Sequence, residues 1–147
     1  MDIDRLFSIA GSALDSQRQR LNIIAGNLAN ADSTRAPGGG PYVRRDVVFQ
    51  AQNEASPFRR VFAQAFGGPE ETHGVKISKV IFDERPSRRV YDPKHPDAGS
   101  DGFVRMPNVN VMEEMTNLLS ASRAYEANLT VLETGKTMTL RALEMGR

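Results

Sequence analysis

Proline is confined to the middle of this chain, and this confinement limits the fold more than any other feature. All eight prolines lie between Pro37 and Pro107, and eight of the twelve glycines lie in the same interval. Proline lacks a backbone donor and disrupts helix interiors, so the two proline-free ends can be helical. The sequence therefore predicts a helix in residues 1–32, a broken middle segment in residues 33–106 and a second helix in residues 107–147.

The N-terminal segment repeats its apolar residues with spacings of four and three. The repeat comprises Ile3, Phe7, Ala10, Leu14, Gln17, Leu21, Ile24 and Leu28. This spacing is typical of a coiled-coil seam, and Gln17 is its one polar break. Asp2 and Asp4 favour a helix start, and residues 30–33 (NADS) favour its exit. We expect a helix about 40 Å long.

The C-terminal segment has a predicted start and two neighbouring seams. Asn110, followed three residues later by Glu113, resembles a capping box, so the helix should begin near Val111. One seam comprises Val111, Met115, Leu118, Ser122, Tyr125, Leu129 and Leu132. The other comprises Ala121, Ala124, Asn128, Val131, Gly135, Met138, Ala142 and Met145. Two seams on one helix can contact two different neighbours.

An ordinary helical hairpin explains most seams of this kind. Here, however, one partner helix cannot cover both C-terminal seams, and the middle segment is too polar and too broken to do so. Each large apolar side chain left in water forfeits about 1.5 to 3 kcal/mol. We therefore expect a mainly α fold with a small β insert, in which the terminal helices form a coiled-coil-like hairpin and other subunits cover the remaining seam.

The middle segment favours short strands and turns. Alternating or β-branched residues predict strands near residues 75–77, 80–82, 89–91 and 103–105, with Asp101-Gly102 as a turn. The glycines at 38–40 predict a flexible joint or a tight loop. A short helix within residues 49–68 is a further expectation.

Composition excludes several classes of function. The 19 Lys and Arg nearly balance the 18 Asp and Glu, so no global field attracts nucleic acid or an acidic membrane. The chain has no cysteine, which excludes disulfides and thiolate sites. The acidic start is unlike a signal peptide, and no run approaches the roughly 20 apolar residues that span a bilayer. We expect no cleaved leader, no nucleic-acid partner and no direct insertion into a membrane.

No residue pattern predicts catalysis, a metal site or a cofactor. His73 and His95 are far apart in sequence and lie among turn-forming residues. The segment 92–97 (DPKHPD) could bind a metal in principle, but two prolines more naturally describe a rigid turn with capping carboxylates. The glycine cluster lacks the lysine of a phosphate-binding loop. Arginine pairs at 44–45, 59–60 and 88–89 alternate with acids, which favours salt bridges between subunits over nucleic-acid binding.

Four segments resemble the flagellar basal-body rod proteins. They are SALDSQRQRLNIIAGNLANAD at 12–32, GGPYVRRDVVF at 39–49, VYDPKHPDAGSDGFVRMPNVNVMEEM at 90–115 and SASRAYEANLTVLETGK at 120–136. The first is similar to a motif shared by rod and hook proteins in general, and the others are narrower. The resemblance covers nearly the whole chain and is weakest in residues 50–72.

The resemblance implies a non-enzymatic structural subunit of the proximal rod. Such proteins pack their terminal helices into a helical tube that surrounds an export channel and transmits torque. The implied partners are copies of this chain, rod proteins of the FlgB, FlgF, FlgG and FliE types, and the flagellar type III export apparatus. The implied location is the basal-body rod within the periplasm.

On this interpretation the subunit interface is drawn from both terminal helices. The predicted interface residues are Leu14, Leu21, Ile24, Asn27, Leu28, Asn30, Val111, Met115, Leu118, Tyr125, Leu129 and Leu132. The alternative is a stand-alone helical adaptor or scaffold that binds one partner helix, which a compact, cooperatively melting monomer would favour. An enzyme using the turn at 92–97 and a nucleic-acid binder are weaker alternatives, to be separated by metal analysis and by salt-dependent retention on DNA.

Overall fold

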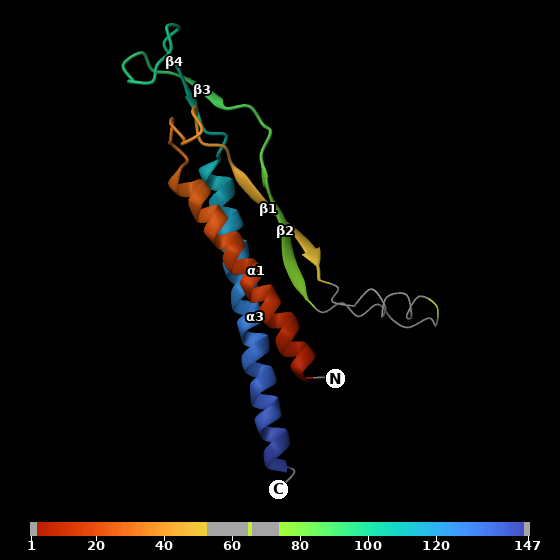
Figure 1. The fold of residues 1–147 in the computed structure, drawn as a ribbon. Helices are drawn as coiled ribbons and strands as arrows, with labels where there is room; N and C mark the ends of the chain where they lie inside the picture. The colour runs from red at the N-terminus through yellow and green to blue at the C-terminus, as the bar shows by residue number, and fades with distance from the viewer. Residues whose placement is uncertain (1–2, 53–64, 66–73, 146–147) are drawn as a thin grey trace. The chain divides into compact units, whose positions relative to one another are not determined.

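The computed structural model describes residues 3–52, 65 and 74–145 (Figure 1). The chain divides into two compact units. Unit 1 comprises Met1–Arg18, Phe49–Ser78 and Arg123–Arg147, and unit 2 comprises Gln19–Val48 and Lys79–Ser122. The elements follow the order α1 (Ile3–Ala29), β1 (Arg45–Ala51), β2 (Val75–Phe82), β3 (Arg88–Tyr91), β4 (Phe103–Met106) and α3 (Val111–Met145). A mainly α fold with a small β insert is confirmed.

Helix α1 occupies the predicted N-terminal segment and ends where its sequence loses helical periodicity. Asn30 closes the helix, because its backbone N–H and its side-chain amide both donate to the carbonyl oxygen of Gly26, at 3.2 and 2.8 Å. Ser33 then donates its N–H to the carbonyl oxygen of Asn30. Of the predicted seam, Ala10 and Ile24 are buried. The predicted exit is confirmed.

Helix α3 begins at Val111 because Asn110 caps it. The Asn110 Oδ1 atom accepts the N–H of Met112 at 3.1 Å, and the Asn110 carbonyl oxygen accepts the N–H of Glu114 at 2.9 Å. The first bond satisfies a donor that has no partner inside the helix, and the second is the first regular bond of the helix. The helix then runs for 35 residues without proline. None of the helices in the described residues carries an apolar stretch long enough to cross a membrane.

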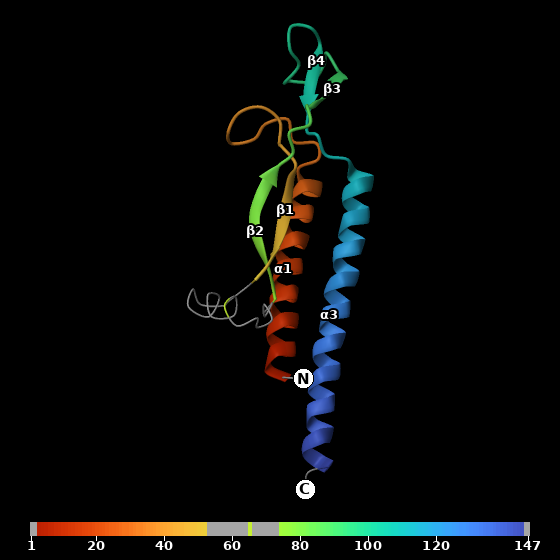
Figure 2. The ribbon, with the colours of Figure 1, turned by 90° about the vertical axis from the view of Figure 1, so that its right-hand side faces the viewer.

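The strands form two separate pairs within the described residues, β1 with β2 and β3 with β4 (Figure 2). The second pair is antiparallel and places Val90 opposite Val104, which is almost fully buried. The predicted strands correspond to β2, β3 and β4 and are confirmed. Strand β1 was not predicted. The helix expected in 49–68 is wrong at its start, because Phe49 belongs to β1; apart from residue 65, the positions beyond 52 lie outside the described residues.

Glycines take the backbone conformations that the turns of unit 2 require. Gly39 and Gly40 have φ angles of 80° and 78°, a region that side chains disfavour. Around them, Ala36 donates its N–H to the carbonyl oxygen of Gly40, and Gly39 donates its own to Ala36. The glycine cluster therefore forms a tight loop. Gly102, with a φ angle of 73°, confirms the predicted turn before β4.

In unit 1, two serines of α1 hold the start of β2. Ser12 Oγ accepts the N–H of Val75 at 3.0 Å, and Ser16 Oγ donates to the Val75 carbonyl oxygen at 3.1 Å. Farther along this unit, α3 approaches α1 at Gly135. A Cβ atom there would lie 2.9 Å from the end of the Leu6 side chain, so a larger residue at position 135 would require this side chain to shift.

Candidate assembly surface and polar junction

A group of buried and half-buried polar side chains joins four segments of unit 2. We call it the polar junction and define it by Asn27, Tyr42, Arg44, Asp83, Asn108 and Glu114. It brings the end of α1, the residues leading into β1, the residue after β2 and the start of α3 into one hydrogen-bonded network. Asn27 and Glu114 are each 0% exposed, although neither residue type is usually found deep in a protein.

Asn27 uses both ends of its amide. Its Nδ2 atom donates to the Arg45 carbonyl oxygen at 2.7 Å and to Glu114 Oε2 at 2.9 Å. Its Oδ1 atom accepts the Arg45 N–H at 3.0 Å and the Tyr42 hydroxyl at 2.9 Å. The amide thus pairs with the backbone of Arg45 as a neighbouring strand would. This pairing holds the start of β1 against α1.

Arg44 supplies the positive charge of the junction. Its Nε atom donates to Glu114 Oε1 at 2.8 Å, and its Nη1 atom lies 3.1 Å from Asp46 and 3.6 Å from Asp83. Burial lowers the pKa of Arg44, but the hydrogen bonds to Glu114 and Asp46 outweigh it, so the pKa is raised. The guanidinium is only slightly exposed and stays charged. Glu114 therefore has a charged partner on one oxygen and an amide on the other.

Asn108 and Asp83 close the junction on the side of the β strands. Asn108 Oδ1 accepts the Arg44 N–H at 2.9 Å, and its Nδ2 atom donates to the carbonyl oxygens of Asp83 and Arg85. The Arg85 side chain and backbone N–H both donate to the Asp83 carboxylate, which lowers the pKa of Asp83 to about 2. The hydrogen bonds of Asn108 fix the backbone near Arg44, Asp83 and Arg85, and those of Arg85 fix the Asp83 carboxylate.

Helix α3 carries a long series of large apolar side chains that are exposed among the residues that the structure describes. Met112, Leu119, Met138 and Leu143 are 72, 62, 68 and 66% exposed. The full set is Val111, Met112, Met115, Leu119, Leu129, Val131, Met138, Leu140, Leu143 and Met145. The covered row of α3 instead runs through Glu114, Leu118, Ala121, Tyr125, Asn128, Leu132 and Gly135. From Leu118 onward it alternates between the two predicted seams. The exposed apolar residues come partly from these seams and partly from positions outside both, namely Met112, Leu119, Leu140 and Leu143.

The structure distributes the twelve predicted interface residues over different environments. Ile24 and Asn27 are buried within unit 2. Partly covered positions are Leu14, Leu21, Leu28, Asn30, Leu118, Tyr125 and Leu132. Val111, Met115 and Leu129 are exposed. Contact with a neighbouring subunit stays a prediction for all twelve, and Asn27 already has four hydrogen-bond partners in its own chain.

The turn at residues 92–97 has the predicted form of a rigid turn. Asp92 Oδ1 accepts the Lys94 N–H at 3.1 Å, and His95 Nδ1 accepts the Asp97 N–H at 3.0 Å. The Asp97 carboxylate accepts the Thr34 hydroxyl at 2.7 Å and pairs with Arg35, and these hydrogen bonds lower the pKa of Asp97. Within the described residues, no group of three metal-ligating side chains occurs. His73 lies outside the described residues.

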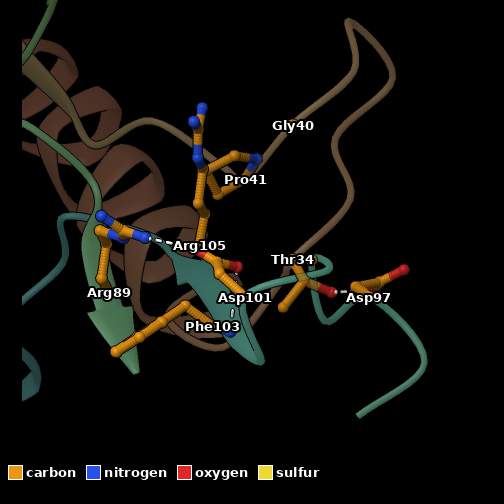
Figure 3. Close-up of a pocket in the computed structure, with 9 residues that line it drawn as sticks. Thr34, Gly40, Pro41, Arg89, Asp97, Asp101, Phe103 and Arg105 are labelled. Carbon is orange, nitrogen blue, oxygen red and sulfur yellow. Dashed lines mark hydrogen bonds and ion pairs between the residues drawn. The ribbon is translucent and has the colours of Figure 1, made fainter. Parts of the chain in front are cut away.

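A polar pocket opens beside this turn in unit 2, and Figure 3 shows its lining. Its volume is about 290 Å³. Its walls come from the loop after α1, from β3 and β4, and from the loop between these strands. The lining residues are Thr34, Gly40, Pro41, Arg89, Asp97, Gly99, Asp101, Phe103 and Arg105.

Arg44 and Arg89, one from each of two arginine pairs, form ion pairs within the chain. Arg44 bonds inside the polar junction, and Arg89 pairs with Asp101 at 2.6 Å while its guanidinium lies 4.9 Å from the centre of the Phe103 ring. The expectation that such arginines bridge subunits is wrong for Arg44. Its carboxylate partner lies 70 residues away in the same chain, a separation that sequence pattern does not reveal.

Comparison with known proteins gives matches at both ends and over the full length. The family described as "Flagella basal body rod protein" matches residues 7–36, and "Flagellar basal body rod FlgEFG protein C-terminal" matches residues 100–145. The chain is 47% identical to the flagellar basal-body rod protein FlgC of Salmonella typhimurium over 147 residues, all of both chains. It is 39% identical to the Bacillus subtilis protein of that name over 145 residues, 95% of each chain. For Borreliella burgdorferi the identity is 38% over 140 residues, 92% of each chain.

Proposed function

Because this chain belongs to the FlgC family of flagellar basal-body rod proteins, we propose that it builds the rod through the exposed apolar residues of α3. The chain is a structural subunit of the flagellar basal-body rod and assembles there with other rod proteins. Its family role is structural, not enzymatic. The proposal concerns how the subunit joins its neighbours and what the joint does.

The single observation that carries the proposal is the uncovered apolar surface of α3. Ten large hydrophobic side chains of this helix are exposed, and full burial of each contributes about 1.5 to 3 kcal/mol. A surface of this kind marks an interaction site in soluble proteins. Neighbouring subunits that covered it would gain enough free energy to offset the entropy lost on assembly. Leu129 and Met115 are the predicted interface residues best placed for such contact.

The polar junction suits the transmission of torque. A shaft subunit must resist deformation while it turns, and a buried network of hydrogen bonds fixes its members in one arrangement. In unit 2 the network ties α1, β1 and α3 through Asn27 and Glu114. We propose that load passes between subunits through the α3 surface and within the subunit through this junction.

The finer features of the assembly belong to the same proposal. Helices α1 and α3 pack in coiled-coil fashion into a helical tube of the proximal rod, which lines the export channel. The neighbours are copies of this chain and rod proteins of the FlgB, FlgF, FlgG and FliE types. The type III export apparatus delivers the chain to the periplasm without a cleaved signal peptide.

The test is a charge placed at Leu129. Leu129→Asp puts a carboxylate into a surface that must lose water on assembly, which costs several kcal/mol when no partner is present. We expect the variant to be produced and exported, but to be lost from isolated basal bodies together with motility. Thr134→Asp is the matched control, since it adds the same charge at an exposed polar position of α3. Normal rods containing Leu129→Asp would refute the proposed surface.

A further inference from the structure

The pairing of β3 with β4 sets two arginines against each other. Their register places Arg89 opposite Arg105, and both side chains line the pocket of unit 2. Like charges that face each other across a strand pair destabilise it unless counter-charges are near. The anion-binding capacity of the pocket therefore depends on which of its two arginines lacks a carboxylate partner.

Only one of the two has a carboxylate partner among the described residues. Arg89 Nη2 donates to Asp101 Oδ2 at 2.6 Å. The other oxygen of Asp101 accepts the Phe103 N–H. Asp97, the second acid of the pocket, is already used by Thr34 and Arg35. Arg105 has no ion pair with any described residue, and in Figure 3 its side chain extends past Pro41, away from Asp97.

The charged residues around the pocket indicate what net charge a bound anion should carry. Arg89 and Arg105 balance Asp97 and Asp101, and Arg35, bonded to Asp97, adds one further positive charge. One negative charge completes the balance. A dianionic phosphate would meet repulsion from both aspartates, whereas a carboxylate carries the single charge required and matches the fork of a guanidinium. Phe103 and Pro41 add apolar surface to the pocket lining, while the Arg105 side chain is exposed and open to a partner.

We propose that this pocket receives the carboxylate of an Asp or Glu side chain from a neighbouring rod subunit, held by Arg105. The inference rests on the proposed function for the identity of the neighbour, but it concerns a different surface from α3. It assigns Arg105 to an intersubunit ion pair and leaves Arg89 to hold Asp101. The contact selects partner and register, since an acidic side chain must meet a pocket of limited volume.

The test compares two arginines of the same strand pair. Arg105→Gln removes the charge and Arg105→Glu reverses it. Arg88→Gln and Arg88→Glu are matched controls, because Arg88 is exposed, lies opposite Met106 and does not line the pocket. Each variant is expressed in cells lacking the wild-type chain. Circular dichroism of the purified protein checks folding, and the amount of chain in isolated basal bodies reports assembly.

We expect the Arg105 variants to fold as the wild type does and to be depleted from basal bodies, about threefold for Gln and about tenfold or more for Glu. Both Arg88 variants should assemble normally. Motile revertants of Arg105→Glu should carry an acid-to-lysine change in a rod subunit. Normal incorporation of both Arg105 variants would overturn the inference while leaving the α3 surface intact, whereas absence of the wild-type chain from basal bodies would instead refute the proposed function.

A second arm separates a protein carboxylate from a free anion. Sodium acetate and inorganic phosphate are titrated into the isolated protein while the amide signals of Gly99 and Phe103 are followed by NMR. We expect weak, Arg105-dependent shifts with acetate and smaller ones with phosphate. Tight phosphate binding, together with normal assembly of the Arg105 variants, would assign the pocket to a free ion and overturn the proposal.

Discussion

The polar junction and the exposed residues of α3 reverse the usual distribution of side chains. In the junction, Asn27 and Glu114 are fully buried, yet each has hydrogen-bond partners for its polar atoms. On α3, Met112 and Leu119 are largely exposed. The junction thus finds its partners inside one subunit, whereas we propose that the α3 surface finds its partners on another.

The two regions differ in what their interactions determine: hydrogen bonds fix the internal geometry, and apolar contacts are proposed to bind other subunits. Buried hydrogen bonds demand one geometry, because each unpaired group costs free energy when it is removed from water. Apolar contact is strong but tolerates more than one arrangement. Polar groups therefore hold the internal structure, and in the proposed function apolar groups provide the contact with other subunits. The following predictions test whether the two regions are as independent as this contrast requires.

The largest loss of stability is expected from Glu114→Ala. The substitution leaves the Arg44 guanidinium buried without its main counter-charge, which typically costs about 3 to 5 kcal/mol in the free energy of unfolding. Urea unfolding followed by circular dichroism measures this loss. Glu113→Ala is the control, since Glu113 is half-exposed and its ion pair with Arg85 is long, at 3.9 Å. We expect this substitution to change the free energy of unfolding by less than about 0.5 kcal/mol. Equal effects of the two would mean that the junction does not act as a buried network.

Asn27→Ala should follow, with a loss of about 2 to 3 kcal/mol. It removes the partner of the Arg45 backbone, the Tyr42 hydroxyl and one Glu114 oxygen, and leaves them buried without replacement. Asn22→Ala, on the exposed side of α1, should be neutral or slightly stabilising because alanine favours helices. Thermal unfolding of both variants gives the comparison, and a neutral Asn27→Ala would contradict the role assigned to the amide.

Acid should weaken the junction through Asp83 by a smaller amount. The folded-state pKa of about 2 lies below the ordinary value of 3.8, so the carboxylate adds stability above the higher value and loses it as the pH falls toward 2. After allowance for solvent screening we expect this term to be about 1 to 2 kcal/mol. Asp83→Asn should be less stable than the wild type by this amount at pH 7. The gap should close between pH 5 and pH 2, and a gap that does not depend on pH would contradict the assignment.

The smallest effect on the isolated subunit is expected from Leu119→Asp. Leu119 is mostly exposed, so a carboxylate there should change the free energy of unfolding by less than about 0.5 kcal/mol. Assembly should nevertheless fail, as judged by the absence of the variant from basal bodies. Ser120→Asp, at the neighbouring exposed polar position, serves as control. A Leu119→Asp subunit that unfolds readily would show that the α3 surface supports the fold as well as the assembly.

Regular periodicity made the helices and three of the strands predictable. Both helix boundaries follow local chemistry, with Asn110 at the start of α3 and Asn30 at the end of α1, and such capping is encoded within a few residues. The alternation at 75–82 and the turn at Asp101-Gly102 are similarly local. The surplus of apolar residues on α3 was also readable, since one partner helix cannot cover a helix on all sides.

The polar junction was not predictable because its partners are distant in sequence. Glu113 and Glu114 are adjacent acids in the first turn of α3, and nothing local distinguishes the exposed one from the fully buried one. Strand β1 was missed although Val47, Val48 and Phe49 favour a strand. Only the pairing of its first residue with the Asn27 side chain of α1 is invisible to a local pattern. Asn27 was predicted as an interface residue, and its four hydrogen bonds lie within its own chain.

The bond between Asn27 and Glu114 also has a consequence for the order of events during folding. It joins residues 87 apart, and closing so long a loop is entropically costly and comparatively slow. The helical turns of α1 can form within microseconds, but the carboxylate that completes the junction enters the chain only when about three quarters of it has been synthesised. A nascent or truncated chain that ends before Glu114 still holds Asp46 and Asp83 beside Arg44, but it lacks the buried carboxylate that joins Arg44 to Asn27, so the junction is completed only after Glu114 has been added.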